Sequence, residues 1–579
     1  MTLVTLDFET YFDEEYSLKK MTTEAYVRDP RFEVLCVCTK QPDKQVQLSD
    51  SQIVAHHAHF EGLILSNHYN ITPAFWFDTL SMARFVFPLA KSHSLESLAA
   101  YFGLFNKTVP YKEFKGKRSS DMDLALRSKL IAGCQHDVEL TYTIFKKLLP
   151  YVPKEELKLI DLTIRMFTEP TLRLDRDRLQ AYAATLAEKQ DDLLESTGAT
   201  KTDLGSAAKF AAILEKLGIE VPKKISPRTG KETYAFAKTD PGFQELLNHE
   251  DEVISQLAEA RLNVKSTIGV TRSSRLLGMD ERGALPVYLN FCGAHTSRWS
   301  GGDGMNFQNF PRGGEMRKSL LATEGHVLCV VDASQIECRI LNWLAKEEWV
   351  LGAFRENRDL YSEMASSFYG YEVNKKEHPQ ERFVGKTLVL GAGYGIGWKK
   401  LQATLKNAKV LLNEIQARRA VGTYRHKHPN VVKLWETADW VIGRMYADPE
   451  WSYQWGPMSI KDKLIQLPSG FNIDFSYLKK DKEGFFLDNP RGRKHIYGGK
   501  LVENVVQGLA RVFMGEAMLA VARRYKIVTC THDEIVYLAP AAKAEEALKF
   551  GLDTMRTAPR WALDLPLDAE GGYDARYSK

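Results

Sequence analysis

Cysteine is scarce in this sequence of 579 residues, and its seven cysteines form no Cys-x-x-Cys pair. The low count excludes a small disulfide scaffold, and the missing pair argues against a zinc site built on cysteine. Several cysteines lie in apolar runs, where a free cysteine behaves as a small buried side chain: Cys36, Cys38, Cys329 and Cys530. These features predict a protein of a reducing, cytoplasmic compartment.

Long hydrophobic runs are absent too, since none approaches the roughly 18 uninterrupted apolar residues that a membrane-spanning helix needs. The N-terminal stretch MTLVTLDFETYF reaches Asp7 too soon for a signal peptide. No internal repeat is visible, which excludes solenoids and propellers. The net charge is only +4, from 78 Lys and Arg against 74 Asp and Glu, so it says little about a polyanionic partner. The composition predicts a soluble globular protein with no membrane partner.

The pattern along the chain predicts a multidomain protein with α/β and α+β parts. Residues 1–150 mix apolar strands with helical patterns, and residues 151–276 are almost wholly helical. Strand-like segments return in 277–345, and 346–468 is helical and rich in Trp, Tyr and basic residues. Residues 469–579 combine a helix with a strand pair. Residues 277–579 are therefore predicted to form a sheet domain that is interrupted by a helical insertion.

Two aspartates stand where apolar strands end. HVLCVVDAS runs into Asp332, and KIVTCTHDEIVYL places Asp533 at the turn of an expected hairpin. Aspartate is depleted in strands, and two carboxylates on neighbouring strands would repel each other unless cations lay between them. Such a pair can hold two Mg²⁺ ions for in-line phosphoryl transfer. Two unrelated turn aspartates are an equally weighted alternative on this evidence alone.

Between those aspartates, ERFVGKTLVLGAGYGIG predicts a helix with cations on one face. Arg382, Lys386 and Leu390 follow at intervals of four residues, and Tyr394 comes four residues later. Arginine and lysine on one face suit the oxygens of a triphosphate, and an aromatic at the helix end can stack on a base. A solvated basic helix is the alternative.

These segments resemble motifs of the DNA polymerase I family (family A). DASQIECR, RFVGKTLVLGAGYG and THDEIV are similar to its three ordered polymerase motifs, and GAHTSRWSGGDGMNFQNFPR and ENVVQGLAR are similar to two further segments. The resemblance implies a right-hand fold with a palm in 277–345 and 469–579, fingers in 346–468, and a connector and thumb in 151–276. It implies template-directed addition of dNTPs to a primer 3′-OH, and a bacteriophage member acting in the bacterial host cytoplasm.

The resemblance also implies roles for individual residues. Two Mg²⁺ ions would be held by Asp332, Asp533 and the Ala333 carbonyl, with Glu534 beside them. The incoming dNTP would be contacted by Arg382, Lys386, Leu390, Tyr394, Glu337 and Gln335, where Glu337 crowds the sugar C2′ and rejects ribonucleotides. Primer–template DNA would be contacted by Arg298, Gln308, Gln507 and His532. Leu390 replaces the Phe or Tyr usual in the family, which predicts discrimination against dideoxynucleotides.

The N-terminal segment resembles an RNase H-like 3′–5′ exonuclease of the DEDD type. Asp7 and Glu9 end the first expected strand, AHHAHFEGLIL supplies Glu61, and CQHDVELTYTIF supplies Asp137. The resemblance implies a second pair of Mg²⁺ ions held by these four carboxylates. Gly133 stands where the family has a tyrosine that orients water. A polymerase with an inactive or weakened exonuclease is therefore the alternative.

Basic residues in ARLNVKSTIGVTRSSR fall on one expected helical face: Arg261, Lys265, Arg272 and Arg275. Such a stripe would neutralise phosphates of duplex DNA, and a solvated basic face is the alternative.

Two other classes of protein compete with the hypothesis of a DNA polymerase. A single-subunit RNA polymerase is disfavoured by Glu337, and a non-catalytic accessory subunit is disfavoured because Asp332 and Asp533 are present. The expected partners are primer–template DNA, dNTPs and a processivity factor or other replication proteins.

Overall fold

The structure is a computed structural model that describes residues 1–41, 47–226, 230–265, 268–408 and 410–578. Its residues cluster into two compact units. Unit 1 contains Met1–Leu172, Ala284–Phe310 and Leu321–Lys579, and unit 2 contains Arg173–Gly283 and Pro311–Leu320.

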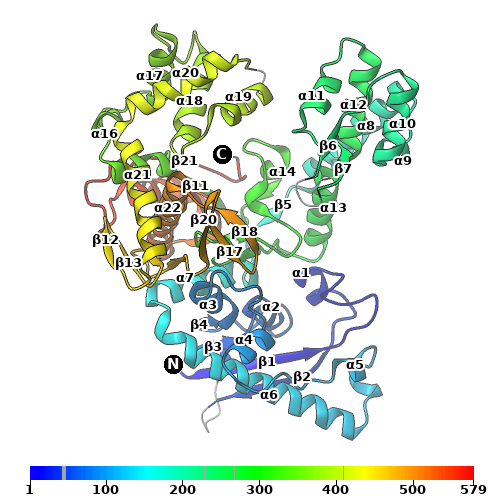
Figure 1. The fold of residues 1–579 in the computed structure, drawn as a ribbon. Coiled ribbons are helices and arrows are strands. Elements are labelled where there is room, and N and C mark those ends of the chain that lie inside the picture. The colour runs from blue at the N-terminus through cyan, green and yellow to red at the C-terminus, as the bar shows by residue number, and fades with distance from the viewer. Residues whose placement is uncertain (42–46, 227–229, 266–267, 409, 579) are drawn as a thin grey trace. The chain divides into compact units, whose positions relative to one another are not determined.

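The N-terminal part of unit 1 is built on a four-stranded sheet of order β2-β1-β3-β4 (Figure 1). Its strands are β1 (Leu3–Thr10), β2 (Val34–Lys40), β3 (Gln52–Ala55) and β4 (Phe75–Asp78). β2 pairs antiparallel with β1, whereas β3 and β4 continue the sheet in parallel. The helices of this part are α1 (Thr23–Val27), α2 (Ala58–Tyr69), α3 (Thr79–Val86), α4 (Leu95–Tyr101), α5 (Tyr111–Phe114) and α6 (Leu124–Leu148). α6 packs against β1, β2 and β3.

The next helix, α7 (Lys154–Thr168), packs against α2 and β4. It therefore belongs to unit 1, whereas the sequence placed it with the connector and thumb. Its apolar face explains the difference, because Leu159, Ile160 and Ile164 are all buried there. The other predicted boundaries inside unit 1 stay predictions.

A second four-stranded sheet, of order β19-β20-β11-β21, forms the centre of the C-terminal part of unit 1. Its strands are β11 (His326–Ala333), β19 (Lys526–Thr531), β20 (Glu534–Pro540) and β21 (Ala569–Asp574), and all the pairings are antiparallel. Helix α23 (Ala544–Arg556) packs against β11 and β21, and α22 (Gly498–Ala522) packs against β19. Residues Leu328–Ala333 are buried because helices cover this sheet.

Helix α22 is long and apolar enough to cross a membrane by length and composition, but 72% of its apolar window is buried in the protein. It contacts α7, α23 and β19, so it has the character of a core helix. On its buried side the Arg511 guanidinium donates to the Glu156 carboxylate over 2.5 and 2.7 Å, and the two side chains are only 1% and 3% exposed. This ion pair ties α22 to α7.

The predicted helical insertion is present. Within the expected range 346–468 the helices are α16 (Glu348–Arg355), α17 (Leu360–Tyr369), α18 (Pro379–Ala392), α19 (Trp398–Asn407), α20 (Glu414–Lys427) and α21 (Pro429–Ala447). They follow α15 (Ile336–Ala345), which lies in the range expected to be palm. These helices share a buried core that includes Met364, Leu388 and Tyr424. Helix α17 begins at the side chain of Asp359, which accepts from the backbone amides of Tyr361 and Ser362.

Two small antiparallel meanders follow α21, and the sequence pattern did not predict them. The first begins inside the range 346–468, so the prediction that this range is helical is wrong for its last part. The first contains β12 (Tyr453–Trp455), β13 (Met458–Lys461), β14 (Leu464–Gln466) and β15 (Asn472–Asp474), and the second β16 (Leu478–Asp481), β17 (Gly484–Asn489) and β18 (Gly492–His495). The β13–β14 turn holds Asp462 and Lys463 at φ of 52° and 60°, as a two-residue hairpin requires. Strands of three to six residues are too short for a strong periodic signal.

Unit 2 is mostly helical. It contains α8 (Arg176–Thr197), α9 (Lys201–Gly205), α10 (Ala207–Lys216), α11 (Pro241–Leu247), α12 (Glu252–Lys265), α13 (Ile268–Glu281) and α14 (Glu315–Lys318), with a hairpin of β6 (Lys223–Ile225) and β7 (Glu232–Tyr234). Phe210, Phe243 and Leu257 lie in its buried core.

Candidate active sites

The structure brings the two strand-end aspartates together in the central sheet. Asp332 is opposite Glu534 in the β11–β20 register, and the amide of Ala333 donates to the Asp533 carbonyl over 2.8 Å. His532, at φ 52°, and Asp533 form the tight turn between β19 and β20. The aspartates therefore stand at the same end of two hydrogen-bonded strands, as a two-cation site requires.

A cavity of about 440 Å³ opens beside this turn, and several residues predicted to contact the dNTP, the DNA or Mg²⁺ line it. They are Gln335, Glu337, Leu390, Tyr394, Arg298, His532 and Asp533. At its centre, Tyr394 Oη donates to Glu337 Oε2 over 2.9 Å, and Arg298 Nη1 donates to Glu337 Oε1 over 3.0 Å. Burial and the nearby Glu337 carboxylate raise the pKa of Tyr394 well above its ordinary value, so the phenol stays a donor. Both oxygens of Glu337 are held in place.

The predicted cationic face of α18 is present, but Arg382 and Lys386 do not line the cavity. Arg382 Nε donates to Asp359 Oδ2 over 2.7 Å, and its Nη2 donates to Asp359 Oδ1 over 3.2 Å. Lys386 is exposed, and Leu390, one turn further along, is 44% exposed. Residues four apart on a helix advance by about 6 Å. A chain of phosphates leading from Leu390 along this face would therefore meet Lys386 first and Arg382 second.

The two glutamines predicted to contact DNA already have protein partners. Gln308 is buried, and its Nε2 donates to the Cys530 carbonyl over 3.1 Å. Gln507 Nε2 donates to Glu503 Oε1 over 3.4 Å on α22. Gln308 also lines a small recess with Arg298 and His532.

The prediction that Arg261 binds DNA is wrong. Its side chain is 4% exposed, it donates to the carbonyls of Leu204 and Ser206, and its guanidinium lies 4.6 and 4.7 Å from the ring centres of Phe210 and Phe236. The spacing argument placed it on a basic stripe, but carbonyl and aromatic partners favour its burial. Of the other residues of the expected stripe, Lys265 lies on α12, and Arg272 and Arg275 lie on α13.

A separate carboxylate cluster lies on the N-terminal sheet. Asp7 and Glu9 share one face of β1, α6 carries Asp137 over that face, and oxygens of these three residues lie within 4.8 Å of one another. Glu61 on α2 is not part of that group, but it lines a cavity of about 850 Å³ together with Asp7 and Glu9. Its Oε2 is buried and has no hydrogen-bond partner among the described residues.

The electrostatics of this cluster favour bound cations. Burial, reinforced by Asp137, raises the pKa of Asp7 to about 7, and burial, reinforced by Asp7, raises the pKa of Glu9 to about 9. Burial and the Asp7 charge also raise the pKa of Glu61 well above its ordinary value. Such carboxylates bind protons tightly because they lack enough positive charge nearby, and divalent cations would supply it. The residues present therefore fit a magnesium site.

Two residues of this cavity were missed by the sequence analysis. Lys107 Nζ lies 2.6 Å from Asp137 Oδ2 and donates to Tyr111 Oη over 2.9 Å. The space over Gly133 is already filled, because a Cβ at that position would lie 2.8 Å from Val109 Cγ2 and 3.0 Å from Val109 Cα. Val109 occupies the space that a side chain at position 133 would need. The same segment of the chain contains Lys107 and Tyr111, which lie beside the carboxylates. No local spacing pointed to it.

Comparison with known proteins assigns both parts of the chain. The model of DNA polymerase family A matches residues 176–440, and the model of a 3′-5′ exonuclease matches residues 12–153. The chain therefore carries a DNA polymerase domain of family A and a 3′–5′ exonuclease domain. This confirms the family and fold class that the sequence predicted. The matched residues include neither Asp7 and Glu9 nor Asp533, so the structure alone places those carboxylates.

Individual relatives agree with this assignment. The DNA polymerase of Bacillus phage SP02 is 24% identical over the whole of both chains. DNA polymerase I of Borreliella burgdorferi is 22% identical over 90% of this chain and 55% of its own, and the thermostable DNA polymerase I of Thermus thermophilus is 25% identical over 69% and 45%. The chain thus spans about half the length of these bacterial relatives. The solved POL domain of Pol1 from M. smegmatis, in complex with DNA primer-template and dNTP, shares the fold with a TM-score of 0.69 and 18% identity over 99% of this chain and 95% of that one.

Proposed function

We propose that this family A polymerase adds dNTPs to the 3′-OH of a DNA primer under the direction of a template, in the cytoplasm of a bacterial host. The observation that carries the proposal is the pairing of β11 with β20, which sets Asp332 and Asp533 beside each other next to the cavity around Glu337. Asp332, Asp533 and the Ala333 carbonyl would hold two Mg²⁺ ions, which activate the attacking hydroxyl and stabilise the leaving oxygen. The similar Pol1 domain was solved with primer-template and dNTP.

The other residues of the cavity position the nucleotide. Glu337, held by Arg298 and Tyr394, presents a fixed wall that would exclude a sugar with a 2′-hydroxyl. Lys386 and Arg382 extend from the cavity along α18, so they would neutralise the phosphates of the nucleotide. For this, Arg382 exchanges its bond with Asp359 for one with phosphate.

We further propose that the N-terminal domain removes nucleotides from the primer 3′ end and thereby proofreads. Asp7, Glu9, Glu61 and Asp137 would hold two Mg²⁺ ions, which activate water against the terminal phosphodiester. Tyr111 and Lys107 supply a hydroxyl and a positive charge beside those carboxylates. Their position supports an active exonuclease over a weakened one, because they place a hydroxyl and a cation beside the carboxylates although position 133 is a glycine.

Primer extension and primer degradation test both activities. Asp533→Ala should abolish primer extension while primer degradation continues. Asp7→Ala should abolish degradation while extension continues. Asp488→Ala, at an exposed position on β17, is the matched control and should change neither activity. Extension by Asp533→Ala at the wild-type rate would refute the polymerase site. Extension with ribonucleotides as efficient as with dNTPs would favour an RNA polymerase, and no extension by the wild type would favour an accessory subunit.

The exonuclease proposal has its own test. Tyr111→Phe removes only a hydroxyl, so it should slow primer degradation at least tenfold while extension stays unchanged. Degradation at the wild-type rate would exclude this hydroxyl from the reaction. The expected processivity factor remains a prediction, which product lengths with and without other replication proteins would test.

A further inference from the structure

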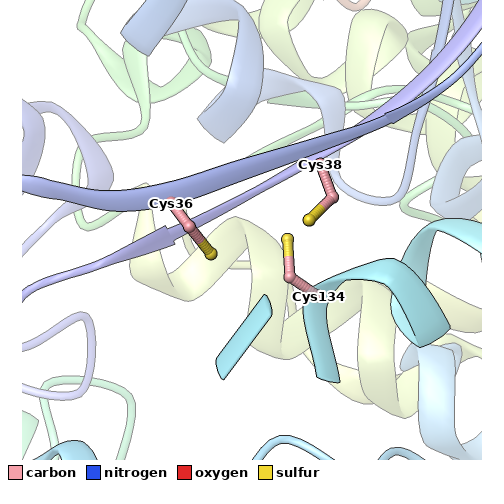
Figure 2. Close-up of side chains that lie close together, drawn as sticks. All are labelled: Cys36, Cys38 and Cys134. Atoms are coloured by element: carbon pink, nitrogen blue, oxygen red, sulfur yellow. The ribbon is translucent and has the colours of Figure 1, made fainter. Parts of the chain in front are cut away.

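Three cysteine thiols converge between β2 and α6. Cys36 and Cys38 alternate on β2 and so share a face, and Cys134 faces them from α6 (Figure 2). The three Sγ atoms all lie within 4.8 Å of one another. The arrangement contains no Cys-x-x-Cys pair, because Cys36 and Cys38 occupy alternate positions on a strand and Cys134 comes from a helix distant in sequence.

The cluster has the dimensions of a thiolate metal site. Sulfurs bound to one Zn²⁺ at about 2.3 Å with tetrahedral angles lie about 3.8 Å apart. Cys38 and Cys134 are 8% and 0% exposed, whereas Cys36 is only half-buried and leaves an approach from outside. The Sγ atoms, which lie within 4.8 Å of one another, need to move only slightly to reach the spacing of about 3.8 Å around one ion.

A fourth ligand is already in contact with the cluster. The Cys134 thiol lies 3.4 Å from the Asp7 carbonyl and 3.7 Å from Asp7 Oδ2. Carboxylate oxygens of aspartate are among the ligands that Zn²⁺ takes in proteins. Asp7 would then stand between two cation sites, the sulfur site on one side and the carboxylate cluster with Glu9 and Asp137 on the other.

We propose that Cys36, Cys38 and Cys134 bind one Zn²⁺ ion, with the Asp7 carboxylate as the fourth ligand. Three thiol donors favour zinc over the magnesium that suits the neighbouring carboxylates. Each bound thiol releases its proton to solvent, so affinity rises with pH. A disulfide uses only two of the three sulfurs, and Cys36 with Cys38 on one strand is a poor geometry for it, so a metal accounts for the cluster better.

The proposal has a consequence for the exonuclease, and this consequence alone rests on the function proposed above. An Asp7 carboxylate drawn to Zn²⁺ no longer holds Mg²⁺ with Glu9 and Asp137. Zinc in stoichiometric amount should therefore inhibit primer degradation in magnesium buffer. Primer extension should be unaffected, because it uses the carboxylates of the other sheet.

Titration of the reduced, metal-free full-length protein with Co²⁺, followed by competition with Zn²⁺, tests the site directly. We expect one ion per chain, with the thiolate-to-metal charge-transfer absorption of a cysteine site. Cys36→Ser, at the half-buried position, should weaken binding at least tenfold, and Cys38→Ala serves if that variant misfolds. Cys329→Ala, a buried cysteine of the central sheet, is the control and should bind like the wild type.

Absence of charge-transfer absorption, or equal binding by the wild type and both cluster variants, would overturn the site and leave the cysteines as packing residues. A mass loss of two hydrogens on mild oxidation, without metal binding, would assign the cluster to a disulfide instead. In the primer-degradation assay, the Cys36→Ser variant should degrade primer at the same rate with and without added zinc. Zinc inhibition that persists in this variant would refute the shared role of Asp7, whereas a wild type without any exonuclease would refute the proposed function and leave the binding result intact.

Discussion

Raising the pH should destabilise the metal-free exonuclease domain, because its buried carboxyls hold their protons in the folded state. The pKa of Asp7 rises from its ordinary 3.8 to about 7. A folded-state pKa above the unfolded value means that stability is complete below pH about 4 and is lost as the pH rises toward about 7. Each pKa unit corresponds to about 1.4 kcal/mol, so Asp7 alone accounts for about 4 kcal/mol. Glu9, with a pKa of about 9, extends the loss to higher pH.

Calorimetric unfolding in EDTA measures this effect through Asp7→Asn, which is neutral at every pH. At pH 8 the variant should be more stable than the wild type by up to about 4 kcal/mol, and this advantage should shrink by about 2–3 kcal/mol at pH 5. Mg²⁺ should reverse the order at pH 8, because only the wild type offers the full carboxylate set to the cation. Asp50→Asn, at an exposed position, is the control.

Two results would refute this reasoning. If the wild type and Asp7→Asn unfold alike in EDTA at pH 8, the carboxyl at position 7 is not held in the raised-pKa state. If Mg²⁺ stabilises both proteins equally, the carboxylate cluster is not the cation site. Neither result depends on exonuclease activity.

Other predictions concern the polymerase part. Glu337→Ala removes the wall held by Arg298 and Tyr394 and should raise ribonucleotide incorporation at least tenfold, measured by competing rNTP and dNTP extension; unchanged selectivity would contradict the gate. The wild type should discriminate against dideoxynucleotides and Leu390→Tyr should accept them, as termination ladders would show, and equal termination by both would contradict this. Glu156→Gln leaves Arg511 without its buried counter-charge and should cost about 3–5 kcal/mol in denaturant unfolding; a loss below about 1 kcal/mol would show that the pair is dispensable.

The polymerase carboxylates could be predicted because their signal is local. Asp332 and Asp533 each interrupt an apolar strand, and that is visible in a few consecutive residues. Their register is not visible there. It depends on the pairing of β11 with β20, which sets Asp332 opposite Glu534 and Ala333 next to Asp533.

Arg261 shows where local reasoning fails. Its spacing from Lys265 is right for a shared helical face, yet the chain buries it between Phe210 and Phe236. Periodicity reports which residues share a face, but whether that face meets solvent depends on the elements packed against it. The carbonyls of Leu204 and Ser206, far away in sequence, decide that Arg261 is inside.

The sequence by itself predicted the family, the order of the two domains along the chain, and the candidate carboxylates Asp7, Glu9, Asp137, Asp332 and Asp533, because motifs are short and their residue types follow from metal chemistry. Only the tertiary structure decided which distant side chains join them. Lys107 and Tyr111 reach the exonuclease carboxylates over Gly133, and Cys134 meets Cys36 and Cys38 across a strand and a helix. Those neighbours are set by packing between segments up to about a hundred residues apart, and no local pattern encodes such a contact.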